Sequence, residues 1–235
     1  GIQSFHDKLL QSMGSYHTYE TSIKGISNVF DVFGGISIDL LFRVPYQSIK
    51  MWRSELLKVV KNKSIDHVSC YSFVSSGGLP QPTKIEEAIM TIDCHKILTE
   101  NGFEHYASCA SGGFDFTSNK KSMYEVLHWS APQAEFIGLG PGAFGFINNS
   151  TSINLVDHKL YKNNLENGKL PIISLTNSED HEMMRRYFVL GVKTNSVSLS
   201  IFKEIYKQDP EVIFEDEFRI LDKMNLARID DNYLK

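Results

Sequence analysis

Short apolar runs alternate with stretches of helical periodicity along the first half of the chain. Residues 36–42 (ISIDLLF) form an apolar run that predicts a buried strand, and residues 67–74 predict the next strand. Helices are predicted at 19–33 and at 48–61, where apolar side chains recur at helical spacing. Because both strands are more apolar than alternating, this order predicts parallel βα units whose helices cover the sheet.

The stretch after residue 82 carries one clear helix signal. Thr83 and Glu86 form a capping box, which predicts a helix that ends before Gly102. Residues 103–110 predict another strand, and residues 112–123, rich in Gly, Ser, Asn and Lys, predict a loop.

A glycine-rich loop with Gly140, Gly142 and Gly145 follows a predicted strand at 136–139, the last strand of this half. Glycine adopts positive φ and lets a backbone come close to a ligand. However, GLGPGAFG is not a G-x-G-x-x-G motif that opens a helix, and no Walker lysine follows it. A plain turn and a binding loop therefore stay open as alternatives.

A polar stretch after residue 147 marks a predicted boundary between a domain at 1–147 and a domain at 148–235. Ser178 is the predicted cap of the first helix of the second domain, and Asp231-Asn232 predicts a turn between two short strands. The tail resembles a winged-helix arrangement. Its helices are predicted at residues 178–192, 199–207 and 210–224.

Composition excludes several classes of function. The 235 residues carry 24 basic and 28 acidic side chains, a net charge of -4 that offers no basic surface to a nucleic acid. We find neither an apolar run of membrane-spanning length nor a signal peptide at the start, so we expect a cytoplasmic protein. Cys70, Cys94 and Cys109 are odd in number and far apart, which favours reduced thiols over a disulfide framework.

Isolated polar residues give two candidate sites. Asp39 in its apolar strand is costly to bury unpaired, so it either caps a neighbouring loop or hydrogen-bonds a hydroxyl or amine of a ligand. The eight histidines show no metal-binding spacing, and His128, beside Trp129 and the glycine loop, is the one candidate for chemistry among them. The sequence identifies no catalytic residue and no metal ligand.

Six segments, taken together and in order, resemble the HemN/HemW-like radical S-adenosylmethionine proteins, the family of oxygen-independent coproporphyrinogen III oxidases. The stretch MYEVLHWSAPQAEF is most similar to the branch related to class C radical methylases. The six segments are GIQSF (1–5), SIDLLFRVPYQS (37–48), DHVSCYSF (66–73), NGFEHY (101–106), EFIGLGPGA (135–143) and RRYFVLGVK (185–193).

The resemblance implies a fold and a set of site residues. The fold is an open (βα)6 barrel followed by a mostly helical C-terminal region. Gln3, Asp39 and Val74 match positions that contact S-adenosylmethionine, and Phe144 matches a position near a second such molecule in some members. The loop with Gly140 and Gly142 would then line the substrate side.

Two kinds of departure from the family pattern stand out. Ser15 replaces an expected arginine, and Arg43 replaces a glycine. The family's C-x-x-x-C-x-x-C motif, whose thiolates hold a [4Fe-4S] cluster, has no counterpart among the three cysteines. We therefore expect the chain to begin halfway round the barrel and to leave a strand edge open at 37–42, available to a missing N-terminal half or to a second copy.

The resemblance implies three alternative functions. The first is the C-terminal part of a radical S-adenosylmethionine enzyme, an oxidoreductase or methyltransferase if the cluster-binding half is present, acting on a tetrapyrrole or another small molecule. The second is a haem chaperone without turnover, with His128 or His105 as the axial ligand. The third is a truncated, inactive interaction protein.

Overall fold

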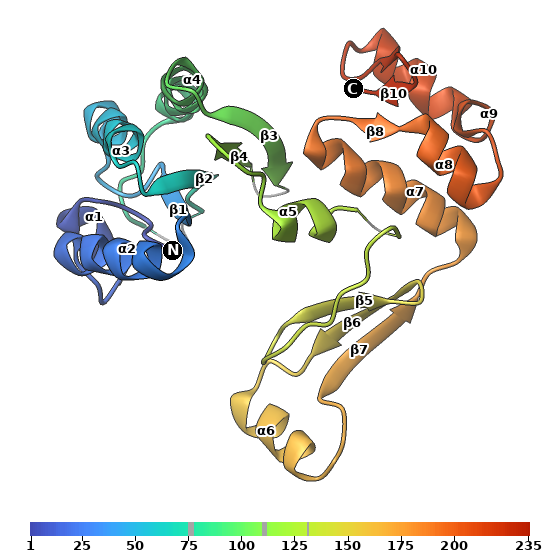
Figure 1. The fold of residues 1–235 in the computed structure, drawn as a ribbon, viewed down its shortest axis with the longest axis horizontal. Coiled ribbons are helices and arrows are strands. Elements are labelled where there is room, and N and C mark those ends of the chain that lie inside the picture. The colour runs from blue at the N-terminus through green and yellow to red at the C-terminus, as the bar shows by residue number, and fades with distance from the viewer. Residues whose placement is uncertain (75–77, 110–111, 131) are drawn as a thin grey trace. The chain divides into compact units, whose positions relative to one another are not determined.

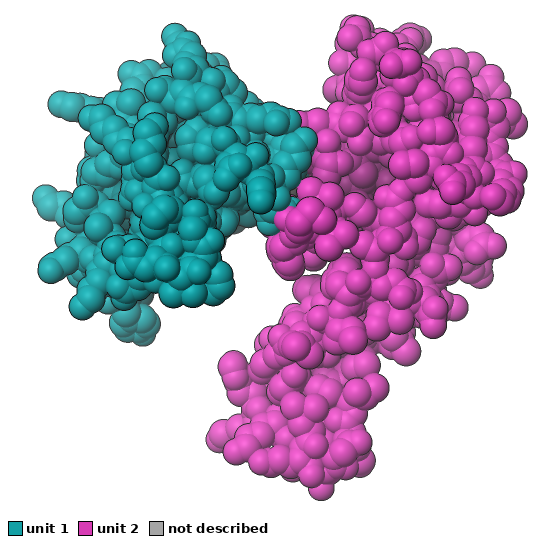
Figure 2. All heavy atoms as spheres, in the orientation of Figure 1, with its two compact units in different colours: residues 1–122 teal, residues 123–235 magenta. Residues whose placement is uncertain are grey.

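The computed structural model describes residues 1–74, 78–109, 112–130 and 132–235. The chain forms two compact units, residues 1–122 and residues 123–235, coloured separately in Figure 2. Each unit has its own sheet and its own apolar core. The predicted boundary at residue 147 falls between two paired strands of the second unit, so the compact units divide at a different place.

The first unit is a four-stranded sheet with helices (Figure 1). Its strand order is β1-β2-β4-β3; β1 and β2 are parallel, and β4 runs antiparallel to both of its neighbours. The strands are β1 (Ile36–Phe42), β2 (Ile65–Ser72), β3 (Glu104–Cys109) and β4 (Gly113–Thr117). The helices are α1 (Asp7–Ser12), α2 (Tyr19–Phe33), α3 (Ile49–Lys61) and α4 (Lys84–Glu100).

The prediction of a loop at 112–123 is wrong, because this segment holds β4. Phe114 and Phe116 point to the apolar side of the sheet and Asp115 to the other, which is the two-residue alternation of a strand, and Asp115 is buried as well. The flanking Gly, Ser, Asn and Lys residues hide this five-residue strand from a reading of composition. Because β4 is antiparallel, the sheet is mixed, and an all-parallel arrangement is not confirmed.

The predicted capping box of α4 is confirmed. The backbone N–H of Glu86 donates to the Thr83 hydroxyl at 3.2 Å, and the Thr83 N–H donates to the Glu86 carboxylate at 2.8 Å. Gly102, just after the helix, has a φ of 88°, a conformation that glycine adopts without a steric penalty. The strand predicted at 103–110 is confirmed as β3; Ala110 lies outside the described residues.

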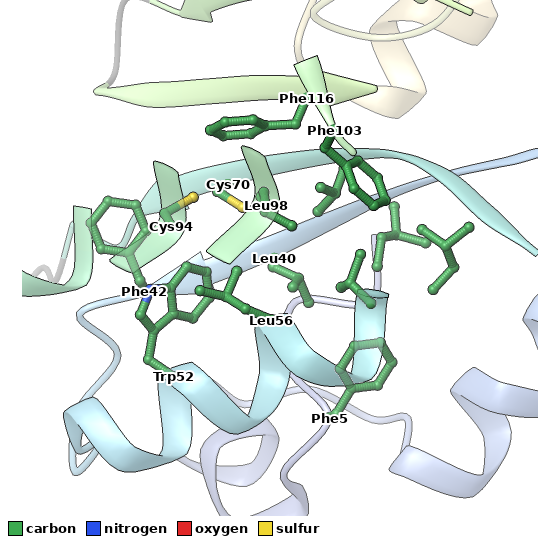
Figure 3. Close-up of a cluster of buried hydrophobic side chains, with 14 of the residues drawn as sticks. Phe5, Leu40, Phe42, Trp52, Leu56, Cys70, Cys94, Leu98, Phe103 and Phe116 are labelled. Carbon is green, nitrogen blue, oxygen red and sulfur yellow. The ribbon is translucent and has the colours of Figure 1, made fainter. Parts of the chain in front are cut away.

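One face of the sheet packs on α3 and α4 to form the core of the first unit (Figure 3). Leu40, Phe42 and Cys70 from the strands lie against Trp52 and Leu56 of α3, all fully or almost fully buried. Trp52 also satisfies its ring nitrogen by donating to the backbone carbonyl of Met90 at 2.8 Å. The apolar positions that predicted α3 and β1 are thus the positions that meet in this core.

The N-terminal segment continues the sheet beside β1. Gln3 forms a parallel bridge with Leu40: its N–H donates to the Asp39 carbonyl, and its own carbonyl accepts from the Leu41 N–H, both at 2.8 Å. Residues 36–39 of β1 line a groove of about 390 Å³ beside α2. The edge of β1 is therefore covered near its carboxyl end, and pairing with another chain along the rest of it stays a prediction.

The second unit contains two small antiparallel sheets and a helical group. The strand order of one sheet is β5-β6-β7 and of the other β8-β10-β9. The strands are β5 (Phe144–Ile147), β6 (Ser150–Asn154), β7 (Ile172–Asn177), β8 (Val197–Ser198), β9 (Ile229–Asp230) and β10 (Tyr233–Leu234). The helices are α5 (Met123–His128), α6 (His158–Glu166), α7 (Asp180–Gly191), η1 (Val192–Thr194), α8 (Leu199–Tyr206), α9 (Pro210–Ile213) and α10 (Glu215–Lys223).

Two predicted features of the tail differ in the structure. Ser178 does not cap α7; the residue at the cap position is Glu179, whose side chain makes no capping hydrogen bond. The helix predicted at 210–224 is interrupted at Phe214, which leaves the helical conformation and points into the core of this unit. The predicted turn at Asp231-Asn232 is confirmed, with positive φ at both residues.

The glycine loop folds back on the β5–β6 hairpin. The predicted strand at 136–139 is reduced to one antiparallel bridge between Phe136 and Phe146. The side-chain amide of Asn154 donates to the carbonyls of Gly138 and Gly140 at 2.9 and 3.0 Å. Gly140 N–H donates to the Tyr161 hydroxyl at 3.0 Å.

Within the described residues, no helix is both long enough and apolar enough to cross a membrane.

Candidate functional site

The second face of the sheet in the first unit carries a row of polar side chains. Asp39 of β1 lies opposite Ser69 of β2, and Ser69 lies opposite Asp115 of β4. The Ser69 hydroxyl donates to Asp115 at 2.5 Å. Since successive side chains of a strand alternate between faces, this row lies away from the apolar core on the helix side. Ser69 and Asp115 are almost fully buried, so Asp39 is the accessible member of this row.

Gln3 and Asp39, both predicted site residues, converge in the structure. A methyl group placed on Gly1 would lie 2.0 Å from the side-chain nitrogen of Gln3 and 2.8 Å from one carboxylate oxygen of Asp39. The Asp39 side chain is 43% exposed, and it lies in the middle of β1 rather than at its end. One oxygen of this carboxylate lies 3.8 Å from the Gly1 nitrogen, and binding of a ligand by Asp39 stays a prediction.

The backbone of Gln3 is held in an unusual conformation. Its φ is 65°, in the left-handed region that a residue with a side chain rarely adopts. The two 2.8 Å hydrogen bonds to β1 flank this residue and fix it. Such strain persists when the surrounding structure over-determines it, and it clusters at ligand sites.

Glu55, a buried carboxylate of α3, anchors the residues that follow Gln3. Ser4 donates its hydroxyl to Glu55, and the Phe5 N–H donates to the same oxygen at 2.9 Å. The other oxygen accepts from the Gln47 side chain at 2.9 Å. Burial raises the pKa of Glu55 to about 7, against these hydrogen bonds, which lower it.

A second polar cluster joins the same face. His67 contacts the Ser37 hydroxyl through Nδ1 at 2.8 Å and the Tyr106 hydroxyl through Nε2 at 2.7 Å. Burial lowers the pKa of His67, opposed by the charges of Asp66 and Asp39. The neutral imidazole can pass a proton between its two hydroxyl partners, and Ser37 is the exposed end of this chain.

The other predicted site residues belong to later segments of the chain. Val74 follows β2 and is 79% exposed. Phe144, at the start of β5, is 56% exposed and belongs to the second unit, as do Gly140 and Gly142. Gly140 and Gly142 have φ values of 106° and 71°, so the turn itself requires glycine at both positions.

The two histidines of the haem interpretation have different surroundings. His128 stacks on Phe136 with the ring centroids 5.1 Å apart, and it contacts Trp129 at 4.5 Å. His105 lies in the first unit against His95, at 4.8 Å, and its Nε2 is 2.9 Å from a backbone oxygen. Burial lowers the pKa of both His128 and His105.

The residues present do not fit an iron–sulfur cluster. Cys70 and Cys94 are fully buried in the apolar core, and burial raises the pKa of Cys70 well above its usual value. A cluster ligand must instead be a deprotonated thiolate that faces the iron, and these two thiols face apolar side chains of the core. The described part of the chain also contains no group of three or more His, Cys, Asp or Glu side chains that could hold a metal ion.

Sequence reasoning missed Glu55, Ser69 and Asp115. Glu55 lies on the buried face of its helix, three residues after Trp52. An acid at an apolar position of the helical pattern could have identified it from the sequence. Asp115 was hidden because its strand was taken for a loop. Pairing of Ser69 with Asp115 depends on contacts between distant segments, which no local pattern encodes.

Comparison with known proteins gives a consistent picture. No family model matches the chain. It is 24% identical to heme chaperone HemW of Bacillus subtilis over 241 residues, covering 96% of this chain and 61% of the relative. It is 28% identical to heme chaperone HemW of Lactococcus lactis, covering 63% and 40%. It is also 28% identical to radical S-adenosyl methionine domain-containing protein 1 of Danio rerio, covering 62% and 34%.

A solved structure shows the same fold. Coproporphyrinogen III oxidase (HemN) from Escherichia coli, described as a radical SAM enzyme, matches with a TM-score of 0.81 at 13% identity. The match covers 99% of this chain and 58% of that chain, so this chain has the mixed α/β fold of the corresponding part of HemN. The chain spans 34% to 61% of the length of the curated relatives named above. The chain is therefore similar in sequence to distant HemW-like relatives and similar in fold to HemN.

Proposed function

We propose that the polar sheet face of the first unit, with Gln3 and Asp39 at its edge, forms one wall of an S-adenosylmethionine site in a radical S-adenosylmethionine protein. The convergence of these two side chains carries the proposal. In this interpretation the sheet is the second half of an open (βα)6 barrel, and the likeness to HemN supports that arrangement.

The side chains suit the chemistry of this cofactor. S-adenosylmethionine presents an ammonium group, ribose hydroxyls and a carboxylate. The Asp39 carboxylate accepts hydrogen bonds from an ammonium or a hydroxyl, and the Gln3 amide both donates and accepts. Glu55 fixes the segment after Gln3, and that segment holds the amide in place.

The role of these residues is to bind and orient. The cofactor would supply the hydrogen-abstraction chemistry of the family, and the substrate would be a tetrapyrrole or another small molecule that is methylated or oxidatively modified. The cluster ligands would come from outside this sequence, since the sequence lacks the cysteine motif and Cys70 and Cys94 are buried. Val74 and Phe144 would pack against bound molecules, as the resemblance implies.

Calorimetric titration of the chain with S-adenosylmethionine tests the proposal. We expect Asp39→Asn to weaken binding about tenfold or more, because a hydrogen bond to a charged group contributes roughly 1.5–3 kcal/mol. Asp31→Asn, on the exposed side of α2, is the matched control and should bind as the unaltered chain does. Equal affinity of Asp39→Asn and the unaltered chain would contradict the proposal.

A second candidate function is haem binding, favoured by the stacking of His128 on Phe136 and by the name heme chaperone that two of the relatives carry. A half-buried imidazole between aromatic rings has the character of an axial haem ligand. Adding haem to the chain should shift its Soret absorbance, and His128→Ala should remove the shift. Retention of the shift in that variant would exclude His128 as the ligand, and His105→Ala then tests the other predicted histidine.

A further inference from the structure

A row of aromatic rings in the second unit ends in a cation at each side. From one end, Phe146, Phe136, His128 and Trp129 follow one another with centroid separations of 6.5, 5.1 and 4.5 Å. Arg186 of α7 lies over Phe146, its guanidinium carbon 4.8 Å from the ring centre. Lys193 of η1 lies over Trp129 at 4.0 Å.

One acidic side chain among the described residues touches this row, since Glu125 accepts a hydrogen bond from the ring nitrogen of Trp129 at 3.0 Å. Arg186 and Lys193 form no ion pair within 4 Å in that part of the chain, and the nearest acid acting on Arg186 is Glu182. The Nε atom of Arg186 is buried and has no hydrogen-bond partner there. An unsatisfied cationic donor costs free energy that an anion would recover.

His128 lies within the field of both cations. Its pKa is lowered first by burial and then by Arg186 and Lys193, so the imidazole stays neutral beside them. Two cations, Arg186 and Lys193, and the imidazole of His128 thus lie along one aromatic row. Cation–π contacts with Phe146 and Trp129 stabilise the two cations, but they leave the hydrogen-bonding capacity of Arg186 unused.

We propose that Arg186 and Lys193 bind the acidic groups of a planar aromatic ligand that lies against His128, Trp129 and Phe136. These three rings are half-buried, so part of each remains open to a ligand. A hollow of about 190 Å³ borders Trp129, and its other lining residues come from outside the aromatic row. Guanidinium and ammonium groups recognise carboxylates, and the rings supply stacking surface.

This inference rests on the haem candidate for the identity of the ligand, and it is independent of the S-adenosylmethionine proposal. It adds the residues that would hold the ligand's acidic groups, whereas the haem candidate concerns the axial ligand alone. Two probes separate them. Metal-free protoporphyrin IX has carboxylates and no axial bond, and its dimethyl ester lacks the free carboxylates.

Fluorescence titration of the chain with both probes tests the proposal. We expect Arg186→Gln and Lys193→Gln each to weaken protoporphyrin IX binding about tenfold and to leave the ester almost unaffected. Lys193→Arg keeps the charge and should retain binding. Arg185→Gln is the matched control, since this neighbouring arginine is exposed and lines a different groove.

The outcomes distinguish the two ideas. If metal-free protoporphyrin binds and haem itself gives no Soret shift that depends on His128, the anion site stands and the haem candidate with His128 as its ligand is removed. Equal binding of acid and ester, or unchanged binding in both glutamine variants, overturns the anion site while haem ligation by His128 can still stand. Failure of both probes to bind overturns the anion site.

Discussion

At the residue scale, Glu55 shows how a buried charge is used to fix a strained segment. Its carboxylate is fully buried and accepts hydrogen bonds from Ser4, Phe5 and Gln47. Removing a carboxylate from water is unfavourable, and these donors offset only part of that cost. The carboxylate nevertheless joins the segment after Gln3 to the end of β1. We infer that burial of the Glu55 carboxylate lowers the stability of the fold and fixes the position of Gln3.

This balance predicts a pH dependence of stability. The folded pKa of about 7 lies above the ordinary value of 4.5 for a glutamate, so unfolding releases a proton between these two pH values. The contribution of Glu55 is therefore fully present below pH 4.5 and is lost as the pH rises through 7. From the size of the shift, we expect this loss to approach about 3 kcal/mol.

Urea unfolding of the chain and of Glu55→Gln at a series of pH values measures this effect. As the pH rises from 5 to 8, the unfolding free energy of Glu55→Gln should increase relative to that of the unaltered chain. Subtracting the two curves removes the opposite contribution of His67, whose lowered pKa makes stability fall as the pH drops below that of a free histidine. Glu100→Gln, exposed at the end of α4, should give a flat difference. A flat difference for Glu55→Gln as well would refute the assignment.

At the element scale, sequence patterns predicted correctly those helices and strands whose formation depends on their own residues. The apolar run of β1 and the helix over 19–33 have the predicted bounds, because one depends on continuous burial and the other on a cap and amphipathic periodicity. The strand β4 and the bridge at Phe136 depend on partners far away in the sequence, and composition alone describes both poorly. Gln3 and Asp39 were proposed from a resemblance, and only the fold shows that they converge.

The cap of α4 allows a quantitative test at this scale. Thr83→Ala removes the hydroxyl that accepts from Glu86 N–H, and we expect it to lower the unfolding free energy by about 1 kcal/mol. Thr99→Ala is the control, because that hydroxyl donates to the carbonyls of His95 and Lys96 near the exposed end of the same helix and caps no N–H group. Chemical denaturation compares the two variants. Equal destabilisation by both would show that the capping box contributes nothing specific.

At the scale of the whole molecule, the two units have separate cores. The large core of the first unit draws on buried residues between Phe5 and Phe116, and those of the second on residues between Phe136 and Leu234. Each unit also contains one of the two tryptophans, Trp52 in the first and Trp129 in the second. A domain whose apolar contacts lie within its own residues has what it needs to fold alone.

We therefore expect residues 1–122 to fold when produced alone. Trp52 is completely buried, so its fluorescence should be shifted to the blue, with the same maximum as in full-length Trp129→Phe, in which it is the remaining tryptophan. Both samples should lose this signal cooperatively in urea, since the core around Trp52 is common to them. The control is the fragment carrying Leu56→Ala, which opens a cavity beside Trp52 and should unfold at lower urea, by roughly 2–5 kcal/mol. A fragment whose Trp52 emits as it does in concentrated urea would show that this core requires residues beyond 122.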